Sequence, residues 1–311
     1  MTLMMNNDIR SQYSTVPRRR TRFTAGLFLD TMPVMFLHTF NPNPILAHLG
    51  SFAIHWYGLF LAVGALAGYL VFIRLGRRYG IKVADLENLF FFTLIAGLVG
   101  ARIYHVLNEW SYYAAHPGEI LSIWNGGLAI HGALIAGLVV FLLFARKKKL
   151  SFWLLADIAA PALALGQAIG RWGNYFNQEL YGGPTSLPWG IPIEPLNRPL
   201  QFLDDKFFHP AFLYESLGSF AVFVLMVYLH RRFLAGTKNG SDNRSVVRGA
   251  GFIALTYLIT ESLVRAGTEL IRIDRVPTIA DVRLPLLISI AIALAAGVAL
   301  FMLMRRRSRA A

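Results

Sequence analysis

Seven apolar segments, each long enough to cross a lipid bilayer as a helix, constrain the fold of this chain more than any other feature. The hydrocarbon core of a bilayer is about 30 Å thick, which a helix of about 20 apolar residues spans. The sixth segment is the least uniform because it contains Glu261 and Arg265. We predict seven transmembrane helices at Ile54–Phe72, Leu89–Leu107, Leu128–Ala145, Phe152–Ile169, Ala211–Leu229, Ala250–Val264 and Leu284–Met304.

The composition favours an all-α integral membrane protein. Hydrophobic residues make up 55% of the 311 residues and charged residues only 15%, whereas soluble domains carry about 25% charged residues. The net charge of +13 would favour a nucleic-acid partner in a soluble protein. Here, however, the basic residues collect in short loops between apolar segments, which is typical of membrane topology. We therefore expect no nucleic-acid partner.

Loop charge predicts the orientation, because basic loops stay in the cytoplasm. The loop 108–127 has no lysine or arginine, and the loop 172–209 has two against four acidic residues. The N-terminus should then lie outside and the C-terminus inside, although the basic run Arg18–Arg22 disagrees with this. The cytoplasmic stretches are Arg74–Lys82, Arg146–Lys149, Arg231–Arg248 and the tail 305–311.

The domain organisation follows from these segments. Residues 51–304 form one seven-span membrane domain, and its loop 172–209 is long for a plain connection, so we expect it to cover an outward-facing site. Residues 1–50 form an N-terminal extension whose apolar run is interrupted by Asp30 and Pro33. Translation from Met32 or Met35 is an alternative that N-terminal sequencing would test.

Several kinds of chemistry lack their usual residues. The chain has no cysteine, which excludes disulfides, thiolate–zinc sites and a cysteine nucleophile. It also has no HExxH, no Walker loop and no paired aspartates for Mg²⁺. We expect no metal and no cofactor, and chemistry that rests on His, Tyr, Arg, Glu and amide side chains.

The stretch GRWGNYFNQELYG, at Gly170–Gly182, places five polar side chains after an apolar segment. If it begins as a helix, Arg171, Asn174 and Gln178 share one face. An arginine supported by amides suits the binding of an anion. Ionisable residues of the other spans fall at the same outer depth: Tyr57, Arg102, His131, His209, Tyr214, Glu215, Arg265, Glu269 and Arg272.

Each of these residues has a plainer interpretation. The charge of Arg102 would simply reach the lipid headgroups, and Tyr57 would belong to the aromatic interface belt. Arg265 and Glu269, at i and i+4, would form an ion pair, and Glu215 would only hydrogen-bond between helices. A histidine within a span is costly without a partner, so His131 favours a functional interpretation. Because these ionisable groups converge at one depth, we predict a functional site at the outer ends of the spans.

The motifs along the chain resemble those of a known family. They are HWYG at 55–58, GARIYHVL at 100–107, WNGGLAIHG ending at Gly132, GRWGNYFNQELYG, HPAFLYE at 209–215, and Arg265-x₃-Glu269-x₂-Arg272. In this order they are similar to the prolipoprotein diacylglyceryl transferases, bacterial enzymes that lipidate the lipobox cysteine of secreted prolipoproteins. The similarity covers residues 51–300, and GRWGNYFNQELYG is its most specific motif.

The resemblance implies a multi-pass enzyme of the bacterial cytoplasmic membrane. It would transfer the sn-1,2-diacylglyceryl group of phosphatidylglycerol to the lipobox cysteine thiol of a prolipoprotein signal peptide and release glycerol 1-phosphate. Ala211 and Phe212 stand where many members carry Ser or Thr and Gln, and Glu261 stands where some carry Tyr. The family's functional residues map onto Tyr57, His131, Arg171, Asn174, Glu179, Gly182, Arg265, Glu269 and Arg272.

The residue types suit this chemistry. A thiol with a pKa of about 8.5 is little ionised at neutral pH, so a general base helps, and His131 is the best candidate. Arg171 and Arg265 would stabilise the leaving phosphate. The proton acceptor remains open between His131 and a Tyr or Glu. Catalysis is thus predicted for His131, Arg171, Arg265 and Tyr57, and phosphatidylglycerol binding for Arg171, Asn174, Glu179, Gly182, Glu269 and Arg272.

Two other classes of function are alternatives to a transferase. A polytopic anion transporter or channel would line its path with Arg102, Arg171 and Arg265. Transporters usually contain repeats and bind at the midplane, whereas this chain has no visible repeat and its spans look apolar in their inner halves. Nothing positive supports a non-catalytic lipid-binding scaffold.

Overall fold

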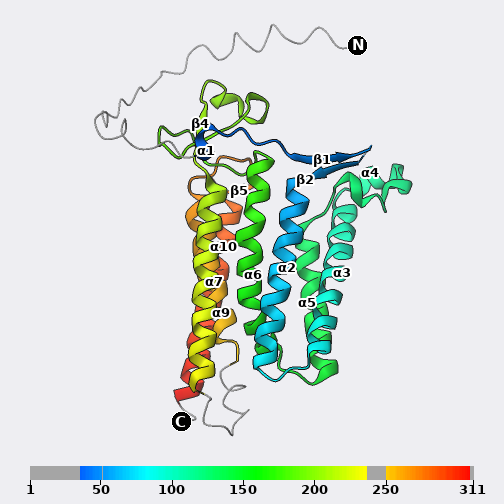
Figure 1. Cartoon of the computed structure of the whole chain (residues 1–311), viewed down its shortest axis with the longest axis vertical. Coiled ribbons are helices and arrows are strands. Elements are labelled where there is room, and N and C mark those ends of the chain that lie inside the picture. The colour runs from blue at the N-terminus through cyan, green and yellow to red at the C-terminus, as the bar shows by residue number, and fades with distance from the viewer. Residues whose placement is uncertain (1–35, 51, 237–249, 309–311) are drawn as a thin grey trace.

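The computed structural model describes residues 36–50, 52–236 and 250–308, which form a bundle of long helices with small elements at one end (Figure 1). The basic run Arg18–Arg22 and the alternative starts at Met32 and Met35 lie outside the described residues. So does most of the predicted cytoplasmic stretch between the fifth and sixth segments.

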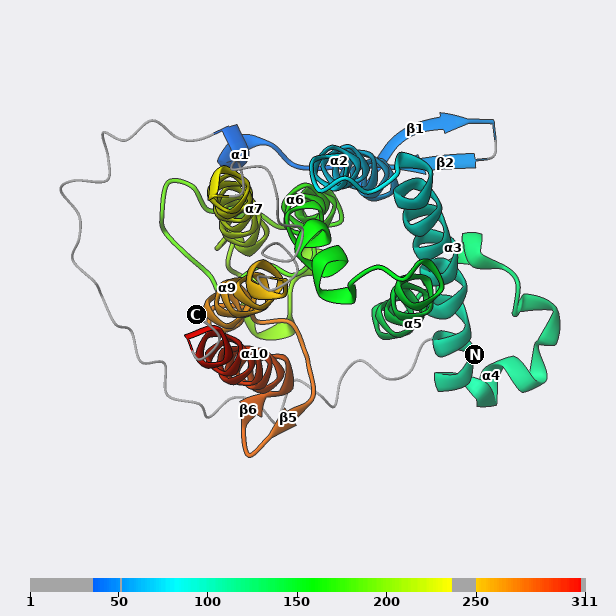
Figure 2. The same cartoon turned by 90° about the horizontal axis from the view of Figure 1, so that it is seen from below.

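Long helices occupy the predicted segments. Six of them are long and apolar enough to cross a membrane, which confirms an all-α integral membrane protein. The further helix α9 lies beside them (Figures 1 and 2), but Glu261, Arg265 and Glu269 place three charges in its 18 residues. The count of seven spans therefore stays a prediction. The helices are α2 (Trp56–Arg78), α3 (Val83–Asn108), α5 (Ile130–Lys148), α6 (Phe152–Phe176), α7 (Ala211–Gly236), α9 (Phe252–Glu269) and α10 (Leu284–Ser308).

Small residues let the helices pack closely. A Cβ on Gly64 of α2 would lie 3.1 Å from the carbonyl oxygen of Gly166 on α6, and one on Gly68 would lie 3.1 Å from that of Ala162. Such contacts are the usual basis of helix association in lipid, where apolar surfaces gain little from meeting one another. α3 packs mainly on α5, while α6, α7, α9 and α10 form the other side of the bundle (Figure 2).

The loop after α6 folds into a small head at one end of the bundle (Figure 1). Its strands β3 (Ile191–Pro192) and β4 (Phe207–Phe208) pair antiparallel, and two short 3₁₀ helices, Pro195–Asn197 and Leu200–Phe202, lie between them. Its core joins the head to the ends of α6 and α7 and to helix α1 (Phe36–Thr39). The buried core residues are Leu37, Tyr175, Tyr181, Ile191, Ile193, Phe208 and Phe212.

Two hairpins and one short arm complete this end. Strands β1 (Ile45–Leu49) and β2 (Phe52–His55) lead directly into α2, and β5 (Thr278–Ile279) and β6 (Val282–Arg283) connect α9 to α10. The arm consists of α4 (Trp110–Ala115) and the 3₁₀ turns Pro117–Glu119 and Ile123–Asn125, and it projects from the end of α3 (Figure 1).

Arg102 fixes this arm to α3. Its buried guanidinium donates hydrogen bonds of 2.6–3.0 Å to the carbonyl oxygens of Glu119, Ile120, Gly126 and Gly127. The plainer interpretation, in which the charge of Arg102 reaches the headgroups, is therefore wrong. Because its donors are used by backbone carbonyls, Arg102 positions the loop that leads into α5 and His131.

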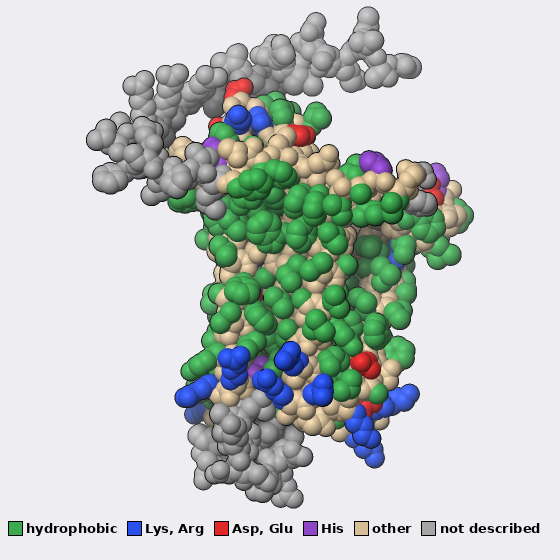
Figure 3. Space-filling view, in the orientation of Figure 1, with side chains coloured by type: hydrophobic (Ala, Val, Ile, Leu, Met, Phe, Trp, Pro, Cys, Tyr) green, Lys and Arg blue, Asp and Glu red, His purple; other side chains and the backbone are tan. Residues whose placement is uncertain are grey.

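The surface suits a membrane protein. Apolar side chains cover the middle of the bundle, and lysines and arginines gather at the end opposite the head (Figure 3). Many large apolar side chains of the spans are exposed, among them Leu66, Ile95 and Leu294. A soluble protein of this size would bury most of them.

Candidate active site

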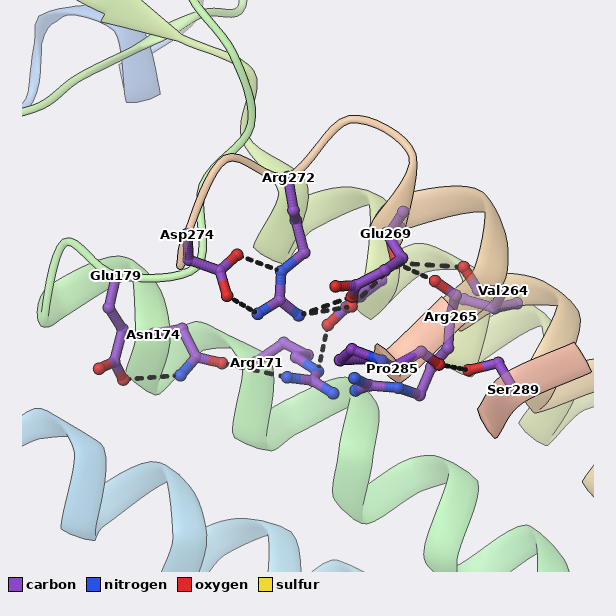
Figure 4. A network of polar contacts seen from close by, with 12 residues as sticks. Arg171, Asn174, Glu179, Val264, Arg265, Glu269, Arg272, Asp274, Pro285 and Ser289 are labelled. Carbon is purple, nitrogen blue, oxygen red and sulfur yellow. Dashed lines mark hydrogen bonds and ion pairs between the residues drawn. The ribbon is translucent and has the colours of Figure 1, made fainter. Parts of the chain in front are cut away.

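The predicted anion-binding arginine lies in a network of charges at the head end of the bundle (Figure 4). Arg171 is in the last turns of α6, and its Nε lies 2.6 Å from Glu215 Oε2 on α7. Their side chains are 19% and 4% exposed, respectively. A buried charge pair of this kind holds the guanidinium in one orientation.

Asn174 and Glu179 extend the network along α6. The Asn174 side-chain oxygen accepts a hydrogen bond of 3.5 Å from Arg171, and its nitrogen donates one of 2.8 Å to Glu179 Oε1. Gln178 and Leu180 adopt left-handed backbone conformations, with φ of 52° and 56°. This turn folds Glu179 back onto the helix, where its backbone N–H donates to the carbonyl of Asn174.

Glu215 connects three helix ends. Besides Arg171, it contacts Arg272 Nη1 at 3.6 Å and accepts a hydrogen bond of 2.9 Å from the Thr268 hydroxyl. The interpretation in which Glu215 only hydrogen-bonds between helices is too narrow, because it also pairs two arginines. The sequence prediction counted Glu215 among the converging groups but left it out of the catalytic and lipid-binding residues, and the motif HPAFLYE was the signal that could have included it.

The end of α9 carries a second group of ion pairs. Arg272 lies 3.6 Å from Glu269 and donates to Asp274 at 2.8 and 3.0 Å. Arg283, on β6, lies 2.7 Å from Glu269 and 3.2 Å from Asp274. The sequence prediction missed Asp274 and Arg283, because Asp274 lies in the loop after α9 and Arg283 in the hairpin that follows this loop.

The pKa values in this group reflect the pairing. Burial by itself would raise the pKa of Asp274, but its hydrogen bond to Arg272 and the charges of Arg272 and Arg283 lower it. Burial by itself would lower the pKa of Arg272, yet Asp274, Glu269 and Glu215 raise it. The group is therefore held in its ionised form.

Arg265 differs from the other arginines. Among the described residues, its guanidinium makes no ion pair and no hydrogen bond, since Glu269 pairs with Arg272 and Arg283 instead. The expected Arg265–Glu269 ion pair is thus wrong. Arg265 points toward the guanidinium of Arg171, close enough for the two charges to interact (Figure 4). An anion bound between these two half-buried guanidiniums would reduce the repulsion between their charges.

Gly182 and Tyr57 lie next to the arginine site. A Cβ on Gly182 would lie 2.8 Å from His209 Cβ and 3.0 Å from the Ile271 carbonyl oxygen, so glycine allows the head loop to meet the end of α9. Tyr57, in the first turn of α2, packs on Gly173 and lies close enough to Glu179 and Arg171 to feel their charges.

This arrangement agrees with the comparison with known proteins. A sequence model described as prolipoprotein diacylglyceryl transferase matches residues 44–303. The chain belongs to this family. Three relatives are each named phosphatidylglycerol–prolipoprotein diacylglyceryl transferase. The one from Nostoc sp. is 43% identical over 243 residues, covering 78% of this chain and 83% of its own. Those from Synechococcus elongatus and Bacillus velezensis are 41% and 40% identical over 258 and 253 residues, covering 83% and 80% of this chain and 86% and 87% of theirs.

As a member of the prolipoprotein diacylglyceryl transferase family, the chain is a membrane transferase, and the resemblance drawn from its motifs is confirmed. Most residues onto which the family's functional positions map come together around Arg171 and Arg272. His131 is the exception. It lies exposed at the start of α5, its ring centroid is 5.7 Å from that of Tyr104, and among the described residues it makes no hydrogen bond.

Proposed function

We propose that this transferase moves the sn-1,2-diacylglyceryl group of phosphatidylglycerol to the lipobox cysteine thiol of a prolipoprotein. The products are a thioether-linked diacylglyceryl prolipoprotein and sn-glycerol 1-phosphate. The names of the relatives support both substrates. The observation that carries the proposal is the guanidinium of Arg265, which is unpaired among the described residues and faces that of Arg171.

The two arginines suit the departing group. When the carbon–oxygen bond breaks, negative charge grows on the phosphate oxygen that leaves. Fixed guanidiniums in a site of low dielectric constant stabilise such charge without having to reorganise. Arg171 is fixed by Glu215 and Asn174, whereas Arg265 is available to the phosphate.

The neighbouring residues bind and orient the lipid. Glu179 and Asn174 offer an acceptor and an amide to the headgroup hydroxyls, and Tyr57 closes the site from the side of α2. Glu269 and Arg272 hold the end of α9, while Gly182 keeps the head loop close to it. The sequence leaves the acceptor of the thiol proton open between His131 and a Tyr or Glu. The basic end of the bundle (Figure 3) supports a cytoplasmic location for that end, so the site would face outward in the cytoplasmic membrane.

The test uses purified protein in detergent with phosphatidylglycerol and a lipobox peptide. Mass spectrometry should detect a thioether-linked diacylglyceryl peptide. Arg171→Ala and Arg265→Ala should each slow its formation by about 10²–10³-fold, the usual cost of losing a group that stabilises developing charge. Arg78→Ala, exposed at the far end of α2, is the matched control and should be unaffected.

Two outcomes contradict the proposal. If the wild-type protein forms no thioether product, the transferase reaction as written is wrong. If proteoliposomes instead conduct anions, and Arg265→Ala abolishes the current, the anion transporter or channel is the better description.

A further inference from the structure

A buried carboxyl group, Glu261, lies close enough to the two facing arginines for their charges to act on it. It is on α9, one helical turn before Arg265, and only 8% of the residue is exposed. Its Oε1 accepts a hydrogen bond of 2.7 Å from Ser219 on α7. Its Oε2 is buried and has no hydrogen-bond partner among the described residues. Buried polar atoms are nearly always paired, so this free oxygen needs an explanation.

The charged and titratable groups around Glu261 come from three helices. α6 contributes Arg171, α7 contributes Glu215, and α9 itself contributes Arg265 and Tyr257. The fourth neighbour, α10, has no titratable side chain between residues 284 and 304. Glu261 is therefore electrostatically part of the arginine site, although it forms no ion pair with Arg171 or Arg265 among the described residues.

The position of Glu261 relative to the arginines fits a role in the reaction. One helical turn, about 5–6 Å along the axis, separates it from Arg265 on the side away from the head. A lipid phosphate held by Arg171 and Arg265 has its diacylglyceryl carbon on that same, tailward side. In a displacement at carbon, the nucleophile enters opposite the leaving oxygen. The attacking thiol therefore lies on the side of Glu261.

We propose that Glu261, rather than His131, accepts the proton of the attacking thiol. The proton moves from sulfur to Glu261 Oε2 while the sulfur–carbon bond forms. The carbon–oxygen bond breaks, and its electron pair leaves with glycerol phosphate, whose charge the arginines stabilise. Ser219 holds the other carboxyl oxygen, which leaves Oε2 as the atom that accepts the proton. This inference rests on the proposed transferase function.

The structure gives Glu261 an advantage over His131 for this role. Glu261 lies close enough to Arg171 and Arg265 for their charges to act on it, whereas the ring of His131 lies 5.7 Å from that of Tyr104, on the α3–α5 side of the bundle. A general base must lie within hydrogen-bonding reach of the proton that it removes.

The experiment compares wild type, Glu261→Gln and His131→Gln with two lipobox peptides, one carrying cysteine and one carrying selenocysteine. A selenol is already ionised at neutral pH and needs no base. Glu261→Gln should lower kcat for the cysteine peptide by about 10²-fold or more at pH 7. The deficit should shrink as the pH approaches the thiol pKa of about 8.5. With the selenocysteine peptide, its rate should stay within threefold of wild type, and KM for phosphatidylglycerol should not change.

The controls separate a base from a structural residue. Glu87→Gln, whose carboxylate hydrogen-bonds Tyr69 elsewhere on the bundle, should match wild type with both peptides. Glu261→Asp keeps a carboxylate but withdraws it by one methylene. It should slow the cysteine peptide at least tenfold and the selenocysteine peptide less than twofold, which gives a second test if Glu261→Gln does not fold.

Three results overturn the inference. Glu261→Gln acting at the wild-type rate on the cysteine peptide removes Glu261 from the reaction. Equal slowing of both peptides makes Glu261 structural. Selective rescue of His131→Gln by selenocysteine identifies His131 as the base. If wild type itself forms no thioether with the cysteine peptide, the proposed function fails, and this is distinct from failure of the inference.

Discussion

Gly182 shows how a single missing side chain shapes the site. An added Cβ would press on His209 and on the Ile271 carbonyl oxygen, both near 3 Å. Gly182→Ala must therefore push the head loop away from Arg272, and overpacking of this kind costs about 1–3 kcal/mol. We expect transfer to slow at least tenfold, measured with the lipobox peptide assay. Gly118→Ala, where a Cβ meets nothing within 4 Å, is the control, and equal rates for the two variants would contradict this account.

Asp274 makes the stability of the site depend on pH. Its pKa in the folded protein is lowered from 3.8 by Arg272 and Arg283, despite the opposing effect of burial. A lowered carboxyl pKa stabilises the fold above the unfolded-state pKa, and this contribution is lost as the pH falls through the folded-state value. The melting temperature in detergent should thus be lower for Asp274→Asn than for wild type at pH 7. The melting temperatures of the two proteins should converge as the pH falls below about 3.8, the unfolded-state pKa. A difference that stays constant from pH 7 to this acidic range would contradict the role given to Asp274.

The site residues differ in how well the sequence predicts them. Arg171 and Asn174 are three residues apart on one helix, so their proximity follows from helical periodicity alone. The partners of Glu269 could not be predicted this way. Its helical neighbour Arg265 points to Arg171, and Glu269 pairs with Arg283. That choice depends on where the β5–β6 hairpin returns the chain, which no local spacing determines.

At the level of elements, Asp157 supplies the cap that α9 lacks. The N-cap residue of α9 is Gly251, which has no side chain to accept hydrogen bonds. The carboxylate of Asp157, on α6, instead accepts 2.7 Å bonds from the N–H groups of Gly251 and Ala254. A carboxylate at a helix N-terminus stabilises it through hydrogen bonds and through the helix dipole.

We therefore expect Asp157→Ala to destabilise the bundle by about 1–2 kcal/mol, the typical cost of a lost cap. Thermal unfolding in detergent, followed by circular dichroism, would measure the decrease. Asp204→Ala, an exposed carboxylate of the head, should change little. If the two variants melt together, Asp157 does not anchor α9.

The sequence predicts the apolar parts of the elements better than their ends. α6 was expected to span Phe152–Ile169, yet it continues to Phe176. Arg171 and Asn174 are thus carried on a rigid helix above the apolar stretch. The residues after it showed no helical periodicity, which agrees with the head. The pairing of β3 with β4 and the packing of α1 on them involve contacts distant in sequence, so no local pattern revealed them.

At the level of the whole molecule, charge is distributed unequally between the two ends of the bundle. Lysines and arginines gather at the end opposite the head (Figure 3). Basic loops resist translocation across the membrane. The head and the arginine site would therefore face outward, where the peptide and the phosphatidylglycerol of the proposed reaction would meet. The fold itself is the same in either orientation, so the charge asymmetry is what favours one of them.

This orientation can be tested by labelling single introduced cysteines, because the chain contains no cysteine of its own. Leu196→Cys places a thiol in the head, at a residue that is 95% exposed, and Lys147→Cys places one at the exposed end of α5. A membrane-impermeant maleimide added to intact spheroplasts should label Leu196→Cys at once and Lys147→Cys only after permeabilisation. The cysteine-free chain gives the background. The opposite pattern would place the site on the cytoplasmic side, where a lipobox cysteine delivered by secretion could not reach it.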